Sequence, residues 1–168
     1  MSQLIQFNYC PKCGNTLDKA LDPPRCIICE ITYYRDPKPT SSVLPVMNGK
    51  VLLGIRGRDP YKGSYDVIGG FVEAGELPEA AALREAKEET NLNMKITSLL
   101  GIYSDRYGED GDYTLNFHYV AEVIDGEMRA QDDVASLEWV DMNDLPLNEG
   151  FQNNIDALKD LQKLYKTH

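Results

Sequence analysis

All four cysteines of the chain lie near its N-terminus, in two pairs of the form C-x2-C. Cys10 and Cys13 make the first pair, Cys26 and Cys29 make the second, and twelve residues separate the two pairs. This spacing is typical of two short loops that together hold Zn²⁺ in a closed tetrahedron of thiolates. Because a segment of about 40 residues buries too little apolar surface to fold unaided, it needs a metal whose binding is coupled to folding. We therefore predict a structural zinc ion with no open coordination position for catalysis.

Two disulfides are the alternative use of four cysteines, and they require an oxidising compartment. Residues 1–9 contain neither a basic region nor an apolar run of signal-peptide length. The longest apolar runs, 51–55 and 120–124, are also far shorter than a membrane span of about 20 residues. We therefore expect a cytoplasmic protein with metal-binding cysteines and no membrane association. The proline-containing run 36–40 predicts a domain boundary near residue 40.

The chain is strongly acidic, with 17 basic and 27 acidic residues and a formal net charge of -10. Such a surface repels polyanions over most of its area, so we expect no polymeric nucleic acid as a partner. Small phosphorylated molecules are compatible with this charge, because divalent cations such as Mg²⁺ bridge carboxylates to phosphates. The charge balance therefore favours a small phosphorylated ligand.

Beyond residue 40, short apolar runs alternate with turn signals. Asn48-Gly49 is a strong hairpin signal between the first two runs. Gly69-Gly70 is expected to end the third strand, and Asp125-Gly126 to turn the chain after the fourth. The fourth run alternates apolar and polar residues over nine positions, which is the pattern of a half-buried strand. The five expected strands are 42–47, 51–56, 65–68, 115–123 and 137–140.

Two helices are expected among these strands. Residues 78–90 have a helix-forming composition, and Pro78 suits the first turn, where a missing N–H costs nothing. Near the C-terminus, an apolar stripe that begins at Ile155 and ends at Tyr165 predicts an amphipathic helix. Strands and helices mix without a regular βαβ rhythm. We therefore predict an α+β fold in which a mixed β-sheet lies between α-helices.

The helix expected over 78–90 carries three glutamates close together. At 100° per residue, Glu85, Glu88 and Glu89 fall within about 100° of one helix face. Their repulsion costs a few tenths of a kcal/mol per pair in an isolated helix, so something must offset it. Neighbouring Arg84 offsets part of it, or a bound divalent cation does. An ordinary solvated acidic face is the alternative interpretation.

The segment around this helix resembles the Nudix box, G-x5-E-x7-R-E-U-x-E-E-x-G-U, in which U is a bulky aliphatic residue. Read from Gly70 to Leu92, the chain matches seven of the nine constrained positions. The departures are Ala86 at the first U and Asn91 at the last glycine. Because Asn tolerates the left-handed backbone of a helix-ending glycine, the second departure costs little.

Three further segments extend the resemblance to this family. Residues 63–70, GSYDVIGG, resemble the family's G-x-W-x-L-P-G-G strand, and residues 137–146 resemble its closing strand and turn. The cysteine segment, which ends in YYRDPKP at 33–39, resembles the zinc ribbon of NADH pyrophosphatases and related Nudix enzymes. The resemblance implies a zinc ribbon over 1–39 and a Nudix hydrolase domain with a C-terminal helix over 40–168.

The family's reaction is metal-dependent hydrolysis of a nucleoside diphosphate linked to another moiety, which releases a nucleoside monophosphate. By resemblance, Glu85 and Glu89 hold the catalytic Mg²⁺ or Mn²⁺, and Glu88 holds a second ion or orients water. The Gly69 carbonyl completes the coordination shell. Asp133 lies where relatives place a further metal-binding acid, although an ordinary loop acid is the alternative.

Arg84 is expected to steady the catalytic loop and helix by pairing with Glu76 or Glu73, as in the family. An exposed ion pair with the glutamate four residues later is the alternative. The box leaves the general base open between Glu85, Glu89 and an acidic residue of a later loop.

The residues that contact substrate are expected outside the box. Arg56 and Arg58, at the end of the second strand, are expected to contact phosphate, with solvated strand-end arginines as the alternative. Tyr103, Arg106 and Tyr107 lie after the box, where family members build specificity. Aromatic residues there stack on a base or belong to the core.

The substrate itself is left open by the sequence. NADH pyrophosphatases carry an S-Q-P-W motif about ten residues after the box, whereas residues 102–107 read IYSDRY, without Trp or Pro. ADP-ribose, NADH, FAD, a dinucleoside polyphosphate and a damaged nucleotide therefore all stay open.

Two expectations concern alternatives and assembly. A non-catalytic nucleotide-sensing regulator or interaction module is the alternative function, but the intact box glutamates and the acidic charge argue against it. Many family members are dimers, and the apolar stripe of the C-terminal helix suggests a homodimer. Packing of that stripe on its own domain is the simpler explanation.

Overall fold

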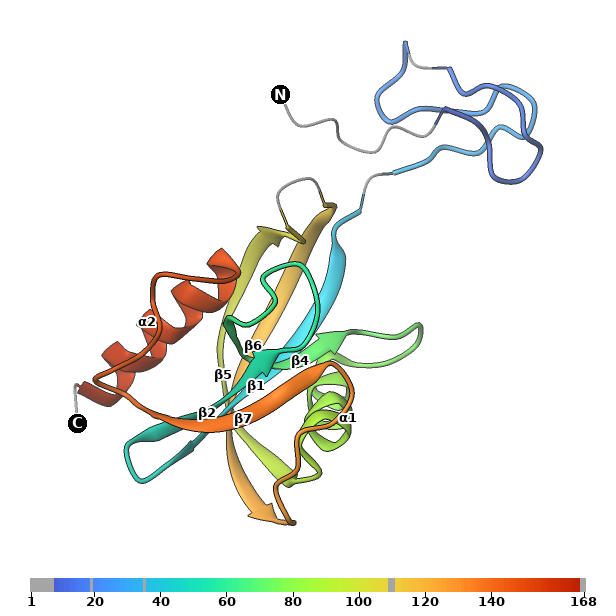
Figure 1. Ribbon diagram of the computed structural model, residues 1–168. Helices are drawn as coiled ribbons and strands as arrows, with labels where there is room; N and C mark the ends of the chain where they lie inside the picture. The colour runs from blue at the N-terminus through green and yellow to red at the C-terminus, as the bar shows by residue number, and fades with distance from the viewer. Residues whose placement is uncertain (1–7, 19, 35, 109–110, 167–168) are drawn as a thin grey trace.

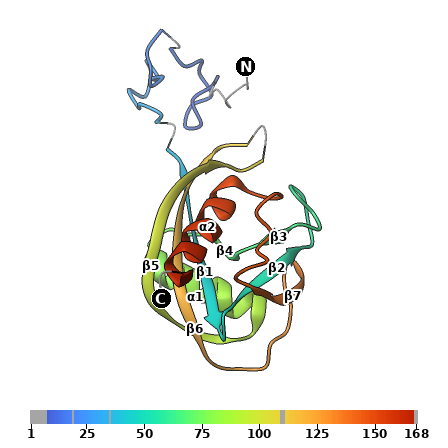
Figure 2. The ribbon, with the colours of Figure 1, turned by 90° about the vertical axis from the view of Figure 1, so that its left-hand side faces the viewer.

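The computed structural model of the protein describes residues 8–18, 20–34, 36–108 and 111–166. Figure 1 shows its elements in chain order: β1 (Lys38–Met47), β2 (Lys50–Arg56), β3 (Tyr65–Asp66), β4 (Ile68–Phe71), α1 (Pro78–Thr90), β5 (Asn93–Arg106), β6 (Tyr113–Asp125), β7 (Val134–Asp141) and α2 (Gln152–Lys166). The cysteine-bearing segment lies beyond the start of β1, apart from the sheet, in Figures 1 and 2. None of the described helices is long and apolar enough to cross a membrane.

The strands form a mixed sheet organised around β1. The first part of β1 pairs antiparallel with β4 and parallel with β6, and its end forms the expected hairpin with β2. β5 pairs antiparallel with β6, and β2 pairs antiparallel with both β3 and β7. The turn of the hairpin at Asn48-Gly49 has φ of 52° and 74°, the positive values that this dipeptide favours.

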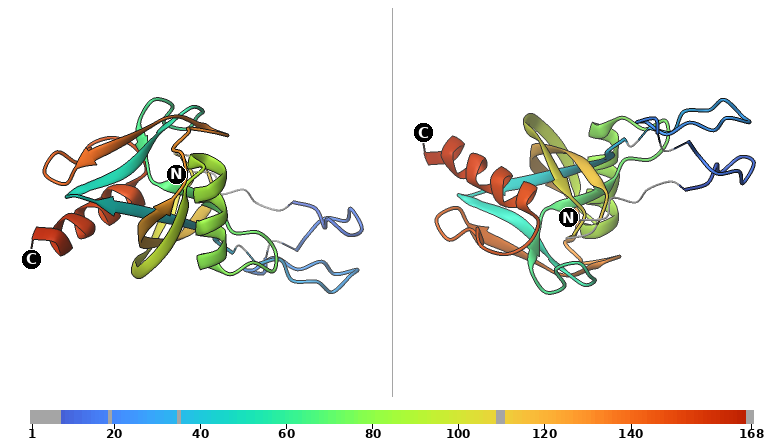
Figure 3. Two further views of the ribbon diagram at one scale, coloured as in Figure 1. Left: turned by 90° about the horizontal axis from the view of Figure 1, so that it is seen from below. Right: turned by 90° about the horizontal axis from the view of Figure 1, so that it is seen from above.

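The two helices cover opposite faces of the sheet, and Figure 3 shows the strands between them. Consecutive side chains of a strand point to opposite faces. Val43 accordingly packs with Ala82 and Ala86 of α1, whereas Leu44 belongs to the cluster that contains Leu158 of α2. The predicted α+β fold, a mixed sheet between helices, is confirmed.

Both predicted helices form, and α1 has the predicted bounds, Pro78–Thr90. Asn91 ends it in the left-handed conformation, with φ of 59° and ψ of 10°, so this residue does replace the glycine of the box. In α2 the apolar stripe is buried through Leu161, while Tyr165 is exposed. Packing on the protein's own domain therefore accounts for most of this stripe.

Three features of the sheet differ from expectation. β1 begins at Lys38, inside the run expected to act as a linker. The third expected strand is two short strands, and β4 continues through Gly69-Gly70 to Phe71, because both glycines pair with β1. β5 has no counterpart among the elements predicted from the sequence. It is an edge strand with bulges, and its irregular alternation hides the period of 2.

The expected half-buried character of β6 is wrong in its central part. The polar residues Thr114, Asn116 and His118 are all buried, with 3%, 5% and 1% of their surface exposed. The beginning of α2 lies over this face of β6, so its polar residues meet other protein groups instead of solvent. His118 is the most deeply buried of the three. Its Nε2 lies 2.8 Å from the Asn153 side-chain oxygen in α2.

We expect His118 to make the stability of the protein depend on pH. Burial lowers the pKa of His118 to about 4, whereas an unfolded histidine has a pKa of about 6.5. The unfolded chain therefore binds a proton that the folded chain does not, and stability present above pH 6.5 is lost as the pH falls toward 4. The facing titratable groups are Tyr103, which contacts the ring, and Asp105 and Asp160, which reach it through Asn153 and Tyr103.

Urea unfolding of the wild type and His118→Gln at pH 7 and pH 5 measures this effect. The wild type should lose about 2 kcal/mol more unfolding free energy than the variant between these pH values. Because all other titrating groups are common to the two proteins, their contributions cancel. An equal loss in both proteins would contradict the assignment.

Candidate functional site

A pocket opens where β1, β4 and β6 meet the beginning of α2. It encloses about 560 Å³ of empty space, part of which is open to solvent. A smaller cavity of about 260 Å³ shares the lining residues Arg56, Gly69 and Asp133 and adds Glu89. The residues that line the pocket are Thr40, Ser42, Arg56, Arg58, Asp66, Val67, Gly69, Gly70, Phe71, Tyr107, Thr114, Asn116, Asp133, Phe151, Asn153 and Asn154.

α1 brings Glu89 to the smaller pocket by lying close to β1 and β4. Ala82 and Ala86 have no exposed surface and allow the helix axis to approach the sheet. On the sheet side, a Cβ at Gly69 would lie 2.3 Å from the Ser41 carbonyl oxygen, and its φ of 156° also favours glycine. A Cβ at Gly70 would lie 2.6 Å from the Glu85 carboxyl carbon. The two glycines and two alanines together make room for the carboxylates.

The three glutamates of α1 occupy different environments. Glu89 is 5% exposed, and its Oε2 accepts a 2.9 Å hydrogen bond from the Gly69 amide. Burial, with the nearby charges of Asp133 and Glu85, raises the pKa of Glu89 to about 9. Burial also raises the pKa of Glu85. Glu88 lies at the rim with 52% of its side chain exposed.

Arg84 connects the helix to the loop before it. Its Nε and Nη2 donate 3.0 Å hydrogen bonds to the two carboxylate oxygens of Glu76, and Nη2 also reaches the Phe71 carbonyl at 3.1 Å. Its Nη1 lies 2.8 Å from Glu85 and 3.1 Å from Glu88. Of the two loop partners expected, Arg84 pairs with Glu76, and it also makes the i,i+4 pair with Glu88. The Glu76 carboxylate in turn accepts a bond from the Glu73 amide at 3.1 Å.

Arg56 and Arg58 reach the pocket from the end of β2. Arg56 is 9% exposed and forms an ion pair with Asp66, whose pKa is raised by burial. Arg58 is 61% exposed and pairs with Asp133 at 2.6 Å. The structure therefore brings Arg56, Arg58, Asp133 and Glu89 together at the two adjoining pockets, although they are separated by up to 77 residues in sequence, whereas Glu85 and Glu88 do not line either pocket.

Comparison with known proteins agrees with this geometry. The family model of the NUDIX domain matches residues 36–161. The chain belongs to the NUDIX family. The crystal structure of a NUDIX hydrolase from Nitrosomonas europaea has the same fold, with a TM-score of 0.82 at 23% identity, over 96% of this chain and 93% of that one. The resemblance stated from the box residues is confirmed.

Two curated relatives of this NUDIX protein have names that state an activity. An ADP-ribose pyrophosphatase of Methanocaldococcus jannaschii is 42% identical over 99 residues, 59% of this chain and 59% of that protein. The NAD-capped RNA hydrolase NudC of Pseudomonas fluorescens is 30% identical over 149 residues, 84% of this chain and 50% of that protein. This chain therefore spans no more than 59% of the length of these two relatives.

Two residues expected to contact substrate lie outside the lining of the pocket. The Tyr103 hydroxyl donates a 3.1 Å hydrogen bond to Asp160 in α2, on the face of the sheet that α2 covers. The Arg106 guanidinium lies over the Tyr113 ring, 5.2 Å from its centroid. Their roles in binding stay predictions. Tyr107, from the same stretch, does line the pocket.

The pocket also contains residues that sequence reasoning missed. Among them are Phe71 and Phe151, whose ring centroids lie 5.6 Å and 5.4 Å from that of Tyr107, a residue that the sequence did indicate. Asn153 and Asn154 come from the first turn of α2. For Thr114 and Asn116, which line the pocket, the available signal was the row of polar residues on β6. Nothing in the sequence marked Phe151 or the two asparagines.

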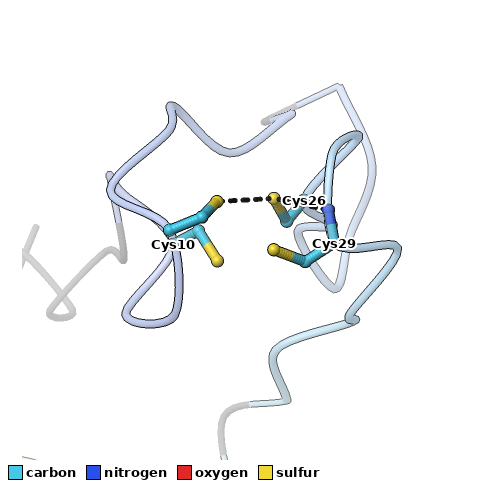
Figure 4. Close-up of side chains that lie close together, drawn as sticks. Cys10, Cys26 and Cys29 are labelled. Carbon is cyan, nitrogen blue, oxygen red and sulfur yellow. Dashed lines mark hydrogen bonds between the residues drawn. The ribbon is translucent and has the colours of Figure 1, made fainter.

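The four cysteines lie together in the N-terminal segment. Their sulfur atoms are all within 4.8 Å of one another, and Figure 4 shows three of these side chains turned toward a common centre. A tetrahedral site with Zn–S bonds of about 2.3 Å places its sulfurs about 3.8 Å apart, and the Cys13 and Cys26 sulfurs are 3.6 Å apart. The Tyr33 hydroxyl, 3.0 Å from the Cys10 sulfur, lowers the pKa of that thiol to about 6. The donor set fits Zn²⁺.

We expect Arg84→Lys to destabilise the loop before α1. A lysine has one ammonium group and cannot reproduce the two-pronged contact with Glu76. Loss of these charged hydrogen bonds should lower the free energy of unfolding by about 1–3 kcal/mol. Urea unfolding and amide hydrogen exchange of residues 71–77 measure the change. Lys87→Gln, on the exposed side of the same helix, is the matched control and should change the stability by less than about 0.5 kcal/mol. Unaltered exchange in the loop would show that Arg84 does not hold it.

Proposed function

We propose that this NUDIX protein hydrolyses the pyrophosphate bond of a nucleoside diphosphate linked to another moiety and releases a nucleoside monophosphate. The observation that carries the proposal is Glu89, which interacts with Asp133 and Glu85 and lies with Asp133 at a pocket lined by two arginines. Carboxylates coordinate the divalent cations that accompany phosphates, and arginines form charged hydrogen bonds with the phosphate oxygens. Family membership and the names of the curated relatives support the same reaction.

The donor set fits a hard divalent cation, Mg²⁺ or Mn²⁺, because buried carboxylate oxygens are the ligands that these ions prefer. Burial and the nearby charge of Asp133 raise the pKa of Glu89, and a bound cation would offset both effects. We propose Glu85, Glu88, Glu89, Asp133 and the Gly69 carbonyl as its ligands. When bound, the metal neutralises charge on the phosphate oxygens and activates water. In this structure Glu85 and Glu88 each form an ion pair with Arg84. Their carboxylate oxygens are therefore farther from a common centre than the four cysteine sulfurs, which lie within 4.8 Å of one another.

The other groups of the site bind and orient the substrate. In the reaction, a water oxygen forms a bond to one phosphorus, the bridging P–O bond breaks, and the water proton passes to a carboxylate. Glu85, Glu89 and Asp133 are the three candidates for that general base. Arg56 and Arg58 would hold phosphate oxygens, while Arg84 would keep the loop and helix in place without contacting substrate.

ADP-ribose is the first substrate to test, because the relative with 42% identity is named for it. The NudC relatives are named for NAD-capped RNA, and this chain's net charge of -10 works against a long polyanion. NADH, FAD and a short NAD-capped RNA therefore belong in the same panel. Location in the cytoplasm and a homodimer stay predictions from the sequence.

The decisive experiment follows release of the nucleoside monophosphate from this panel with Mg²⁺ or Mn²⁺. We expect turnover that EDTA abolishes and that Glu89→Gln lowers by about 100-fold or more, because the substitution removes a charged ligand. Circular dichroism shows whether the variant is folded. Tight binding of the panel molecules without any turnover would favour the non-catalytic sensor instead.

We also propose that Cys10, Cys13, Cys26 and Cys29 bind one structural Zn²⁺. Elemental analysis of the purified protein should find one zinc ion per chain, and Cys26→Ser should abolish its retention. Because folding of so short a segment is coupled to metal binding, the variant should lose order in residues 8–34. The main domain has its own core and should keep its fold. Retention of zinc by the variant would contradict this ligand set.

A further inference from the structure

The Arg56 guanidinium makes contacts through two of its nitrogens and its face, while the third nitrogen makes no hydrogen bond to the described residues. Its Nη1 forms the ion pair with Asp66, and its Nε donates a 2.7 Å hydrogen bond to the Pro60 carbonyl. The guanidinium lies 5.0 Å from the centroid of the Phe151 ring, and the Tyr107 side chain is near enough to interact with its charge, although it makes no hydrogen bond of regular geometry to Nη2. Its Nη2 is buried and has no hydrogen-bond partner among the described residues. Arg56 lines the pocket, so this donor is available to a molecule bound there.

Asp66 is itself fixed by groups on both of its oxygens. Oδ2 contacts Arg56, while Oδ1 accepts hydrogen bonds from the Val67 amide, at 3.0 Å, and from the side chain of Asn154. Asn154 belongs to the first turn of α2 and is 7% exposed. A chain of contacts therefore runs from α2 through Asp66 to the guanidinium. Asp66 occupies one of the unconstrained positions of the strand that precedes the box.

The neighbouring arginine differs in the way it is held. Arg58 also lines the pocket, but it is 61% exposed and pairs with Asp133. Arg56 is thus the buried cation of the pocket with a free donor. A guanidinium binds phosphate oxygens through directed N–H groups, and one that is already oriented loses less freedom on binding.

We propose that Asp66 and Asn154 are positioning residues that orient Arg56 so that its Nη2 binds a phosphate oxygen of the substrate. Neither residue needs to touch the substrate. The Asn154 side-chain amide donates to Asp66 Oδ1, and Asp66 Oδ2 accepts from Arg56. The inference rests on the proposed function in so far as the ligand is a nucleoside diphosphate. It makes the first turn of α2 a determinant of substrate affinity, although α2 carries none of the proposed metal ligands.

Calorimetric titration with ADP in the presence of Mg²⁺ tests the proposal without requiring turnover. Arg56→Met should weaken ADP binding by about tenfold or more. Asn154→Ala should weaken it about three- to tenfold, and the double variant should bind no more weakly than Arg56→Met alone. Gln152→Ala, an exposed position on the same helix, is the matched control and should bind ADP like the wild type. Thermal unfolding shows that each variant is folded.

A second series uses Asp66. Asp66→Asn keeps one acceptor oxygen that can face Arg56 and should retain more affinity than Asp66→Ala, in which the guanidinium loses its partner. If the wild type turns over a substrate, these variants and Asn154→Ala should raise KM while kcat stays within about twofold. If Asp66→Ala does not fold, the comparison of Asn154→Ala in the wild-type and Arg56→Met backgrounds still tests the proposal.

Two results would overturn the proposal. One is a wild type that binds ADP no more tightly than Arg56→Met. The other is an Asn154→Ala substitution that weakens binding as much in the Arg56→Met background as in the wild type, since a residue acting through Arg56 has no effect without it. Failure of the proposed function is a different observation, namely no metal-dependent hydrolysis of any panel molecule while ADP binding follows the expected pattern.

Discussion

The close approach of α1 to β1 and β4 is the constraint on which the rest of the site depends. Ala82 and Ala86 on the helix and Gly69 and Gly70 on the strand keep side-chain atoms out of the space between them. In that space the Glu89 carboxylate reaches the Gly69 amide at 2.9 Å. Larger residues at these positions would move the helix outward and place its glutamates in solvent. Ala86, a departure from the family's bulky aliphatic residue, is compatible with this packing because small size is what the contact with Val43 and Ile68 requires.

Buried negative charge follows from this packing. A carboxylate that loses its hydration without gaining a cation holds a proton more tightly, which is the physical meaning of the raised pKa of Glu89. Arg84 offsets this charge at the outer edge, through Glu85 and Glu88, and ties the same edge to Glu76 in the loop. At the inner end, Arg58 pairs with Asp133, and no basic residue of the described part of the chain forms an ion pair with Glu89. The site is therefore arranged so that a divalent cation has its largest stabilising effect beside the pocket.

The opposite side of the pocket is built by α2. Asn153 contacts His118 and Asp105, and Asn154 contacts Asp66, so two consecutive side chains connect the helix to different strands. The polar face of β6 is buried because it lies under this turn. One layer of the fold thus presents the carboxylates that we propose as metal ligands, and the other carries the asparagines that contact Asp66 and His118.

Local sequence determined the elements whose signals are short in range. The Asn48-Gly49 hairpin, the bounds of α1, its left-handed end at Asn91 and the paired cysteines all depend on neighbours in the chain, so spacing and residue type predict them. The family resemblance added the box glutamates as metal ligands, which is a prediction that the geometry supports and activity measurements must test. The sequence also named Asp133 and the two arginines, although it did not show that they meet.

Only the tertiary structure decided which residues share the pocket. Phe151, Asn153 and Asn154 follow the box by about 60 residues and carry no pattern that marks them. They reach the site because α2 packs its apolar stripe against the sheet. Tyr103 and Arg106 lie outside the lining because the direction of a side chain on β5 depends on its bulges and its pairing with β6. Contacts between segments distant in sequence arise from packing, and a single sequence does not encode them as a local period.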